Sequence, residues 1–518
     1  MKGSFVKGAT LMMLALLVSK IIGACYRIPL TNILGAEGMG LYQMVYPVYA
    51  VALTASSGAL PLAISVLVSE NNAKGNLKAN KMLIKASFVM VVLAGVVIAL
   101  LLAFGSGLIG ALQGARSAKI GYVAIAPAIV FVSGIAVLKG WFQGHAQMFP
   151  TALSSLIEAV VKLAVGLTLA YVLVDYGVAV QVGGALFGVS VSEAVTFVVL
   201  LFIYKRKGVG ENVKLDFNVA KEEYKSILRI SLPITIGGMI FPLTQLIDSF
   251  LVVNILKEAL GSSVATASYG IFSGPVTTLI NLPVSLALAI GVAVVPHLSK
   301  NKEERNLASI KIKTSTALKV AVLIGVPFTA LFLATPKEIL SFLYGSLSES
   351  ELALGVELLR ISAPTVILVS VTQICTSVLQ GLKDLRSPIV NLAIGGAVKL
   401  VLSAILLFTV GVKGVAISGL VAFFVTATLS VISTFRLMGK NLDIIKNSGV
   451  IFAFGGIIGI SLSLVTLLGL SFLWVATIGV ISGIAYLFGV LTSRAFTNEE
   501  ILSLPLGSKI LKLKRNTG

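Results

Sequence analysis

Long apolar runs, repeated along nearly the whole chain, constrain this sequence more than any other feature. Each run holds about 18 residues or more, which at about 1.5 Å per residue is enough to cross the roughly 30 Å hydrocarbon core of a bilayer. Of the 518 residues, 57% are hydrophobic and only 12% are charged, against about 25% charged residues in soluble proteins. The sequence therefore predicts an all-α integral membrane protein with many crossings.

Charged and turn-forming residues divide these runs into about 14 predicted transmembrane helices. Six precede a charged stretch near residues 205–225, six follow it, and two more come before a basic C-terminal tail. The predicted ranges are 8–34, 41–69, 82–104, 119–141, 151–174, 180–204, 227–254, 264–297, 314–335, 352–381, 388–410, 414–435, 448–469 and 471–493.

The basic residues predict the orientation of the chain. Most of the 40 Lys and Arg residues lie in alternate loops, starting with the N-terminal segment and ending with the C-terminal tail. The opposite loops hold only Arg116, Lys119, Lys257, Lys337 and Lys413. Because cytoplasmic loops carry the excess of Lys and Arg, we expect both termini to be cytoplasmic. The net charge of +19 follows from these short loop clusters, so we expect no nucleic-acid partner.

The two halves of the chain repeat each other. Ala126-Pro127, Gln143-Gly144 and Lys162 recur, at one constant spacing, as Ala363-Pro364, Gln380-Gly381 and Lys399. A weaker echo relates Leu60-Pro61 to Leu282-Pro283. Repeats in the same orientation predict two six-helix bundles related by a pseudo-two-fold axis along the membrane normal, which is a transporter architecture.

This pattern predicts five segments along the chain. They are an N-terminal six-helix bundle (1–205), a cytoplasmic linker (206–226), a C-terminal six-helix bundle (227–440), an extra helix pair (441–495) and a basic cytoplasmic tail (496–518).

Catalytic and metal-binding motifs do not appear in the sequence. No segment matches a P-loop, an HExxH zinc motif or a nucleophile elbow. We therefore expect neither an enzyme nor an ATPase, and no cofactor or metal. A gradient, the membrane potential or substrate turnover would have to drive transport.

Charged residues within the apolar helices are the candidate substrate-binding residues, since a charge at the bilayer centre costs about 2.5 to 3.5 kcal/mol on insertion scales. Lys20 and Arg27 lie seven residues apart, close to one helix face. Lys20 has an alternative position at the cytoplasmic headgroups. Glu158 and Lys162 are four residues apart and either bind substrate or neutralise each other. Lys399 repeats Lys162 without a matching acid, so a bound anion is one candidate partner.

Asp248 and several helix breakers complete the candidate set. Asp248 either binds a coupling cation or pairs with a lysine. Gly58, Pro61 and Pro283 lie inside apolar runs, where they either act as hinges or are ordinary packing irregularities.

Three stretches resemble the polysaccharide-biosynthesis branch of the MOP exporter superfamily. They are Leu138–Gly144 followed by Pro150, Glu158 and Lys162; Leu60–Ser65 followed by Val68–Glu70; and Ser19–Gly23 with Arg27 and Gly38–Tyr42. The chain is most similar to the stage V sporulation protein B group and to MurJ-type lipid II flippases.

The resemblance implies two bundles that alternate access for a lipid-linked glycan in a bacterial plasma membrane. It implies that the extra helix pair forms a lipid-accommodating groove and that Lys20 and Arg27 receive the pyrophosphate of the substrate. Lipid II or a similar anionic glycan, membrane lipids and peptidoglycan synthesis enzymes are the implied partners. Thr278 and Asn281 stand where the Gram-negative pattern has an arginine and an acid, which separates this chain from that pattern.

Three alternatives remain at this point. A flippase for another lipid-linked polysaccharide fits the same residues. A MATE-type cation-coupled drug exporter shares the two-bundle plan, but its acidic cavity differs from the mainly basic intramembrane residues here. A scaffold for wall-synthesis enzymes would not need charges in hydrocarbon.

Overall fold

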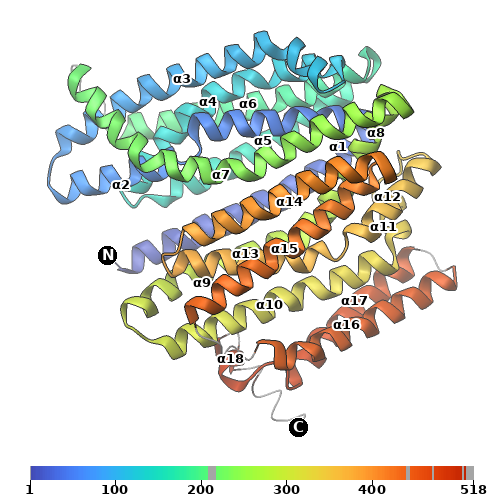
Figure 1. The fold of residues 1–518 in the computed structure, drawn as a ribbon. Helices are drawn as coiled ribbons and strands as arrows, with labels where there is room; N and C mark the ends of the chain where they lie inside the picture. Colours follow the sequence, from blue (N-terminus) through green and yellow to red (C-terminus); the bar gives the residue numbers. More distant parts are fainter. Residues whose placement is uncertain are drawn as a thin grey trace. The chain divides into compact units, whose positions relative to one another are not determined.

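The computed structural model describes residues 2–207, 217–438, 444–469, 472–503, 507–508 and 511, and within these ranges it contains helices and no strands (Figure 1). Contacts divide the chain into two units, Met1–Gly274 and Pro275–Gly518. The all-α membrane fold predicted from the apolar runs is confirmed. The predicted domain boundaries at residues 205, 226, 440 and 495 stay predictions.

The first unit contains eight α-helices and two short 3-10 turns. They are α1 (Lys2–Ser57), α2 (Leu60–Ala73), α3 (Leu77–Leu112), η1 (Arg116–Ala118), α4 (Lys119–Gly144), α5 (Met148–Val172), η2 (Val174–Tyr176), α6 (Val178–Arg206), α7 (Phe217–Leu260) and α8 (Ser262–Ile271).

The sequence predicted a helix break between residues 34 and 41, and the non-helical Gly35 lies in that gap. The break between α1 and α2 at residues 58–59 was not predicted, because the predicted helix 41–69 runs through it. Helix α1 continues to Ser57, with a kink at Gly35, whose φ of 67° and ψ of −177° are not helical. A residue without Cβ adopts this conformation at little cost, so the chain bends there between two helical stretches. The span Leu14–Ala73 holds 60 residues, enough for two crossings at about 1.5 Å per residue.

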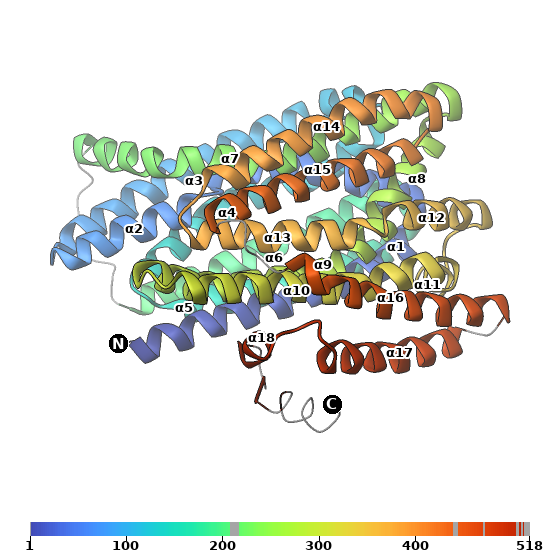
Figure 2. The ribbon, with the colours of Figure 1, turned by 60° about the horizontal axis from the view of Figure 1, so that its bottom comes forward.

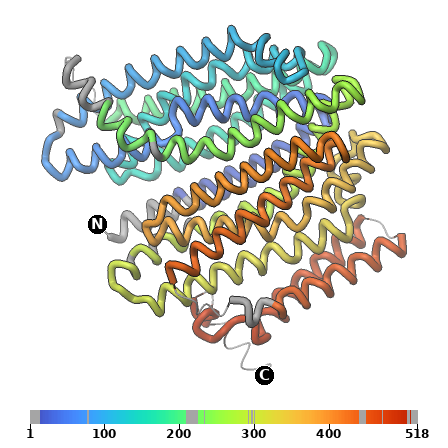
Figure 3. Tube along the Cα trace, viewed as in Figure 1, coloured from blue at the N-terminus to red at the C-terminus, as the bar shows by residue number. Residues whose placement is uncertain are grey.

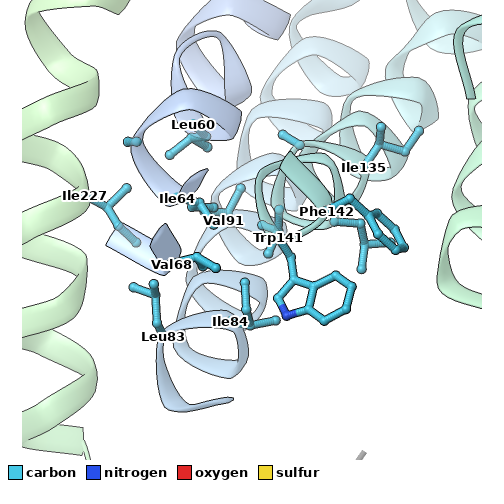
Figure 4. Packing of buried hydrophobic residues seen from close by; sticks show 14 of the residues in the cluster. Leu60, Ile64, Val68, Leu83, Ile84, Val91, Ile135, Trp141, Phe142 and Ile227 are labelled. Carbon is cyan, nitrogen blue, oxygen red and sulfur yellow. The ribbon is translucent and has the colours of Figure 1, made fainter. Parts of the chain in front are cut away.

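A buried apolar cluster fixes α2, α3, α4 and α7 together (Figure 4). Trp141 and Phe142 of α4 belong to this cluster together with Ile64 and Val68 of α2, and Ile227 joins it from α7. Close packing is possible because Gly140 and Gly144 lie against α2; a Cβ at Gly140 would lie 2.7 Å from Cβ of Ile64. The two glycines of the Leu138–Gly144 stretch singled out in the sequence therefore lie on the side of α4 that packs against α2.

The second unit follows a π-helical turn, η3 (Phe272–Val276), which continues α8 into α9. Its helices are α9 (Thr277–Glu303), α10 (Leu307–Ala334), α11 (Pro336–Leu343), α12 (Glu349–Ser362), α13 (Thr365–Gly381), α14 (Arg386–Val410), α15 (Lys413–Met438), α16 (Ile444–Leu467), α17 (Phe472–Thr492) and α18 (Asn498–Ser503).

Among the described residues, 12 helices are long and apolar enough to cross a membrane, and up to 13 if α12 and α13 form one bent span. These two helices meet at 45°, within the single predicted helix 352–381. The predicted total of about 14 stays a prediction. Helices α16 and α17 run side by side and form the extra pair, next to α10 of the same unit (Figures 2 and 3).

The sequence repeat has a structural counterpart in each unit. Ser69 Oγ donates a hydrogen bond of 3.0 Å to the carbonyl of Gly144 in the first unit. Ser299 Oγ donates an equivalent bond of 3.0 Å to the carbonyl of Gly381 in the second. Each repeated glycine therefore ends a helix that is hydrogen-bonded to an earlier helix of the same unit, α2 for Gly144 and α9 for Gly381.

The turns around these bonds also match. Ala146 and Lys383 follow the two glycines at the same distance, and both have positive φ, 56° and 60°. Asn76 accepts a hydrogen bond from the Ala79 backbone N–H at the start of α3, and Asn306 caps α10 through Ser309 in the same way. Because non-glycine residues rarely adopt positive φ, this shared geometry supports two copies of one helical unit.

Candidate functional site

Two basic residues predicted to bind substrate lie on α1. Lys20 is exposed and Arg27 is half-buried. Next to Lys20, Ser19 Oγ donates a hydrogen bond of 2.9 Å to the carbonyl of Ser155, which joins α1 to α5. Thr31 Oγ1 donates to the carbonyl of Arg27 at 2.9 Å. Helix α1 is therefore hydrogen-bonded to α5 next to Lys20.

Charged and phenolic side chains from α1, α5 and α6 lie close to one another. Lys162 of α5 lies within Coulombic range of Glu158, of Tyr42 and Tyr46 on α1, and of Glu193 on α6. We call these five residues the first-unit polar cluster. Arg27 adjoins it, because it lies within Coulombic range of Tyr42.

Within this cluster, Glu158 and Lys162 are within Coulombic range of each other but form no salt bridge. Among the residues that the structure describes, the ion pairs join other groups, and none links these two side chains. Both are half-buried. The cluster therefore combines a cation and two carboxyl groups with tyrosine hydroxyls, which can bind an anion or a cation by charge and hydrogen bonding.

The tyrosines were missed by the sequence analysis. The Tyr42 and Tyr46 ring centroids are 6.0 Å apart and stacked, and the Tyr46 and Tyr49 centroids are 5.9 Å apart and tilted at 60°. Tyr42 and Tyr49 are buried, whereas Tyr46 is partly exposed. Their spacing of four and then three residues places them on one helix face, a signal that was present in the sequence.

Asp248, the proposed ion-coupling residue, lies on α7 and is only 4% exposed. It is within Coulombic range of Tyr269 on α8. Its neighbour Ser249 accepts a hydrogen bond of 2.9 Å from Nε2 of Gln113. Asp248 thus belongs to a buried polar region rather than to the lipid-facing side of α7.

Gln113 is the centre of this region and was also missed. Its side chain is fully buried, and Nε2 donates to the Met44 carbonyl at 3.2 Å as well as to Ser249. Tyr122 donates its hydroxyl proton to Gln113 Oε1. The Gln113 network, which we define as Gln113, Tyr122, Ser249 and the Met44 carbonyl, connects α1, α4 and α7 to the turn after α3.

Two further bonds fasten this turn to α7 and α8. Asn254 Nδ2 donates to the Leu112 carbonyl at 2.6 Å, and Ser262 Oγ donates to the Gly114 carbonyl at 2.9 Å. These bonds help to explain why contacts group α7 and α8 with the first six helices.

Helix α8 crosses α1 at very short range. A Cβ on Gly40 would lie 2.1 Å from the Thr266 carbonyl oxygen, and a Cβ on Gly270 would lie 2.1 Å from the Ala36 carbonyl oxygen. Nearby, Ser263 Oγ donates to Glu37 Oε2 at 2.7 Å. Only residues without a side chain at these positions allow the two backbones to come this close.

In the second unit, Lys399 is half-buried on α14. A Cβ on Gly419 of α15 would lie 4.0 Å from Lys399 Cε, so the lysine stem lies over a glycine. The position that corresponds to Glu158 is Gly395, where any side chain would collide with the Thr426 hydroxyl. Close packing of α14 on α15 therefore leaves no room for an acidic side chain at this position.

The three predicted hinge residues lie at different kinds of position. Gly58 lies in the turn between α1 and α2, Pro61 lies in the first turn of α2, and Pro283 is buried inside α9. Their role as hinges stays a prediction. In the part of the chain that the structure describes, no group of three or more His, Cys, Asp or Glu residues has a metal-binding arrangement.

Comparisons with known proteins define the family. A model described as "Polysaccharide biosynthesis protein" matches residues 5–302, and a model described as MatE matches residues 233–405. The chain belongs to the polysaccharide biosynthesis protein family. The chain is also similar to a lipid II flippase MurJ and to a multidrug resistance MATE family transporter of the MOP superfamily.

Three Bacillus subtilis proteins are similar over most of this chain. The uncharacterized membrane protein YabM is 28% identical and the alignment covers 98% of this chain and 96% of YabM. Stage V sporulation protein B is 26% identical, with 77% of each chain covered. Lipid II flippase MurJ is 24% identical, with 90% and 89% covered.

Two solved structures share the fold. A lipid II flippase MurJ in an inward closed conformation superposes with a TM-score of 0.69 at 17% identity, covering 92% of this chain and 98% of that one. A multidrug resistance MATE family transporter in an inward-facing conformation gives 0.64 at 15% identity, covering 83% and 98%.

Proposed function

We propose that this protein is a flippase that moves a lipid-linked anionic glycan, with lipid II as the first candidate, from the cytoplasmic to the outer leaflet of a bacterial membrane. Alternating access between two helical bundles would carry the headgroup through the protein. The B. subtilis relative named lipid II flippase supports this substrate class.

The observation that carries the proposal is the set of basic side chains on apolar helices of both repeats: Arg27, Lys162 and Lys399. Charges in membrane helices are costly and generally serve a function. Arginine binds phosphate through two parallel hydrogen bonds, and lysine adds a compact charge. A pyrophosphate headgroup matches these groups, with Lys20 receiving it at the entrance to the path.

The extra helix pair would accommodate the polyprenyl tail. Large apolar side chains face outward on α16 and α17, including Leu467 at 81% and Leu473 at 75% exposed. Such a surface is compatible with lipid chains. The tail would stay in lipid while the headgroup moves through the protein.

The membrane potential is the proposed driving force. With both termini and the residue 206–226 linker in the cytoplasm, export moves an anion away from an inside-negative compartment. This is favoured by about 2.3 kcal/mol per charge per 100 mV, or on the order of 4 to 5 kcal/mol for two charges. A coupling cation at Asp248 would add to this, so we expect Asp248→Asn to slow transport without abolishing it.

A MATE-type drug exporter is the second candidate function. The match of residues 233–405 to the MatE model favours it, as do the carboxyl groups of Glu158 and Glu193 in the first-unit polar cluster. Such an exporter would bind cationic drugs through these carboxyl groups, and the basic residues would not be needed.

Depletion in the native bacterium separates the candidates. We expect the lipid-linked intermediate that the protein transports to accumulate in the inner leaflet, and its glycan identifies the substrate. Accumulation of lipid II supports the proposal in full. Accumulation of a different undecaprenyl-linked glycan replaces lipid II as substrate, and unchanged lipid intermediates together with drug sensitivity support the exporter. Recruitment of peptidoglycan synthesis enzymes, a further proposed interaction, is measured by co-purification.

A further inference from the structure

A buried ion pair joins the C-terminal segment to a membrane-spanning helix. Lys319 of α10 and Glu500 of α18 are 1% and 5% exposed at their side chains, and the distance from Nζ to Oε2 is 2.7 Å. The two residues are 181 positions apart in the chain. A buried charge pair of this kind costs desolvation, so it persists only where the surrounding groups satisfy it.

The carboxylate of Glu500 is satisfied by three donors. Besides Lys319, it accepts a hydrogen bond of 2.5 Å from Ser315 Oγ and one of 2.8 Å from the Thr497 backbone N–H. On the other side, Lys319 Nζ lies 5.8 Å from the ring centroid of Phe496, within cation–π range. The charged carboxylate of Glu500 is therefore buried against α10 and is not exposed in a basic tail.

Apolar contacts extend this attachment to the extra helix pair. Phe496 and Ile501 belong to one buried cluster with Val326 of α10, Ile451 of α16 and Val490 of α17. The C-terminal segment thus packs on α10 and on both extra helices at the same end of the pair.

The extra helix pair also contacts α10 and α11 at other points along its length. Tyr486 of α17 donates its buried hydroxyl proton to the Leu323 carbonyl at 3.1 Å. At the opposite end, the rings of Phe342 and Phe472 stack with centroids 3.8 Å apart. These contacts hold the pair along its length, and the ion pair with Glu500 is the attachment with the largest penalty for losing one partner.

We propose that residues 493–503 form a C-terminal clasp, with Glu500 as its positioning residue, that makes the extra helix pair move as one body with α10 during transport. The role of the clasp in transport rests on the proposed function, whereas the clasp itself consists of contacts within the second unit. A pair that detaches from α10 would no longer keep the lipid tail in step with the headgroup.

Hydrogen exchange of the full-length protein in lipid nanodiscs tests the clasp. Glu500→Gln removes the charge and keeps the side-chain size, and Glu499→Gln, at an exposed position on the same short helix, is the matched control. We expect Glu500→Gln to raise exchange in residues 493–503 and in α16 and α17 by at least about tenfold, the effect of lost local stability. We expect α1–α8 to be unchanged. Equal exchange in Glu500→Gln and Glu499→Gln would overturn the clasp.

A neutral double variant tests whether the charges act as a pair. Lys319→Met/Glu500→Met removes both charges and keeps apolar bulk, so it should exchange more slowly than Glu500→Gln. If the double variant instead exchanged as fast as Glu500→Gln, the pairing argument would fail.

A cross-link tests the positioning role. Thr316 Oγ1 and Ser503 Oγ are 3.2 Å apart, so Thr316→Cys/Ser503→Cys can join α10 to the clasp in a variant that lacks Cys25 and Cys375. We expect transport by Glu500→Gln to fall by about tenfold, and the oxidised cross-link to restore it while reduction abolishes the rescue. Transport that is unaffected by Glu500→Gln, or not rescued, would overturn the positioning role. If the wild type moves no lipid-linked glycan, the proposed function fails, while the exchange data still decide on the clasp.

Discussion

The crossing of α1 and α8 predicts that one added methyl group has a large effect. In Gly40→Ala, the new Cβ would lie 2.1 Å from the Thr266 carbonyl oxygen, whereas real Cβ contacts under 3.0 Å essentially do not occur. The helices must therefore separate locally by about 1 Å, and overpacking of this kind costs about 1 to 3 kcal/mol. A difference of 1.4 kcal/mol is about tenfold in an equilibrium constant.

Thermal unfolding and transport assays measure this effect in the same preparations. Gly23→Ala is the matched control, because it lies on the same helix and a Cβ there would have nothing within 4 Å. We expect Gly40→Ala to melt at a lower temperature and to transport more slowly, and Gly23→Ala to stay within about 0.5 kcal/mol of the wild type. Identical melting and transport in the two variants would refute the close crossing.

Three further predictions follow from other sites. Arg27→Ala should abolish transport without preventing folding or insertion, and Arg27→Lys should retain part of it because the charge remains; full complementation by Arg27→Ala contradicts the substrate role. Gln113→Leu should destabilise the protein by about 2 kcal/mol, since the hydroxyls of Ser249 and Tyr122 lose a buried partner, and a wild-type melting curve would contradict the network. Burial alone would raise the pKa of Glu500, but the hydrogen bonds that its carboxylate accepts hold the pKa below the ordinary value of 4.5. Its contribution to stability is therefore present at neutral pH and lost as the pH falls through that lowered pKa. The melting difference between wild type and Glu500→Gln should shrink in acid, and a constant difference would show that this linkage is absent.

The membrane helices were predictable because a bilayer imposes a simple rule on the sequence. A spanning segment needs a long apolar run with its backbone bonded internally, so the predicted 388–410 and the observed α14 nearly coincide. The kink at Gly35 lies in the gap predicted between residues 34 and 41. The break between α1 and α2 and the bend between α12 and α13 were not predicted. Each depends on a local backbone conformation within an uninterrupted apolar run.

The candidate site was predictable only where a residue stood out by its charge. Arg27 and Lys162 were found in this way, since a charge in an apolar run is conspicuous in one dimension. Gln113 is an ordinary polar residue in a loop, and its importance comes from contacts with distant helices. Glu500 was assigned to a basic tail, because its pairing with Lys319 spans 181 positions and depends on the fold.

The flippase account is tested most directly by translocation of lipid II in proteoliposomes that contain the purified protein. The account predicts that the protein moves lipid II between leaflets faster than protein-free vesicles do, that an imposed potential favouring anion export speeds the movement, and that Arg27→Ala abolishes it. Lipid II movement no faster than in protein-free vesicles, in a preparation that exports a cationic drug in response to a cation gradient, would contradict the account.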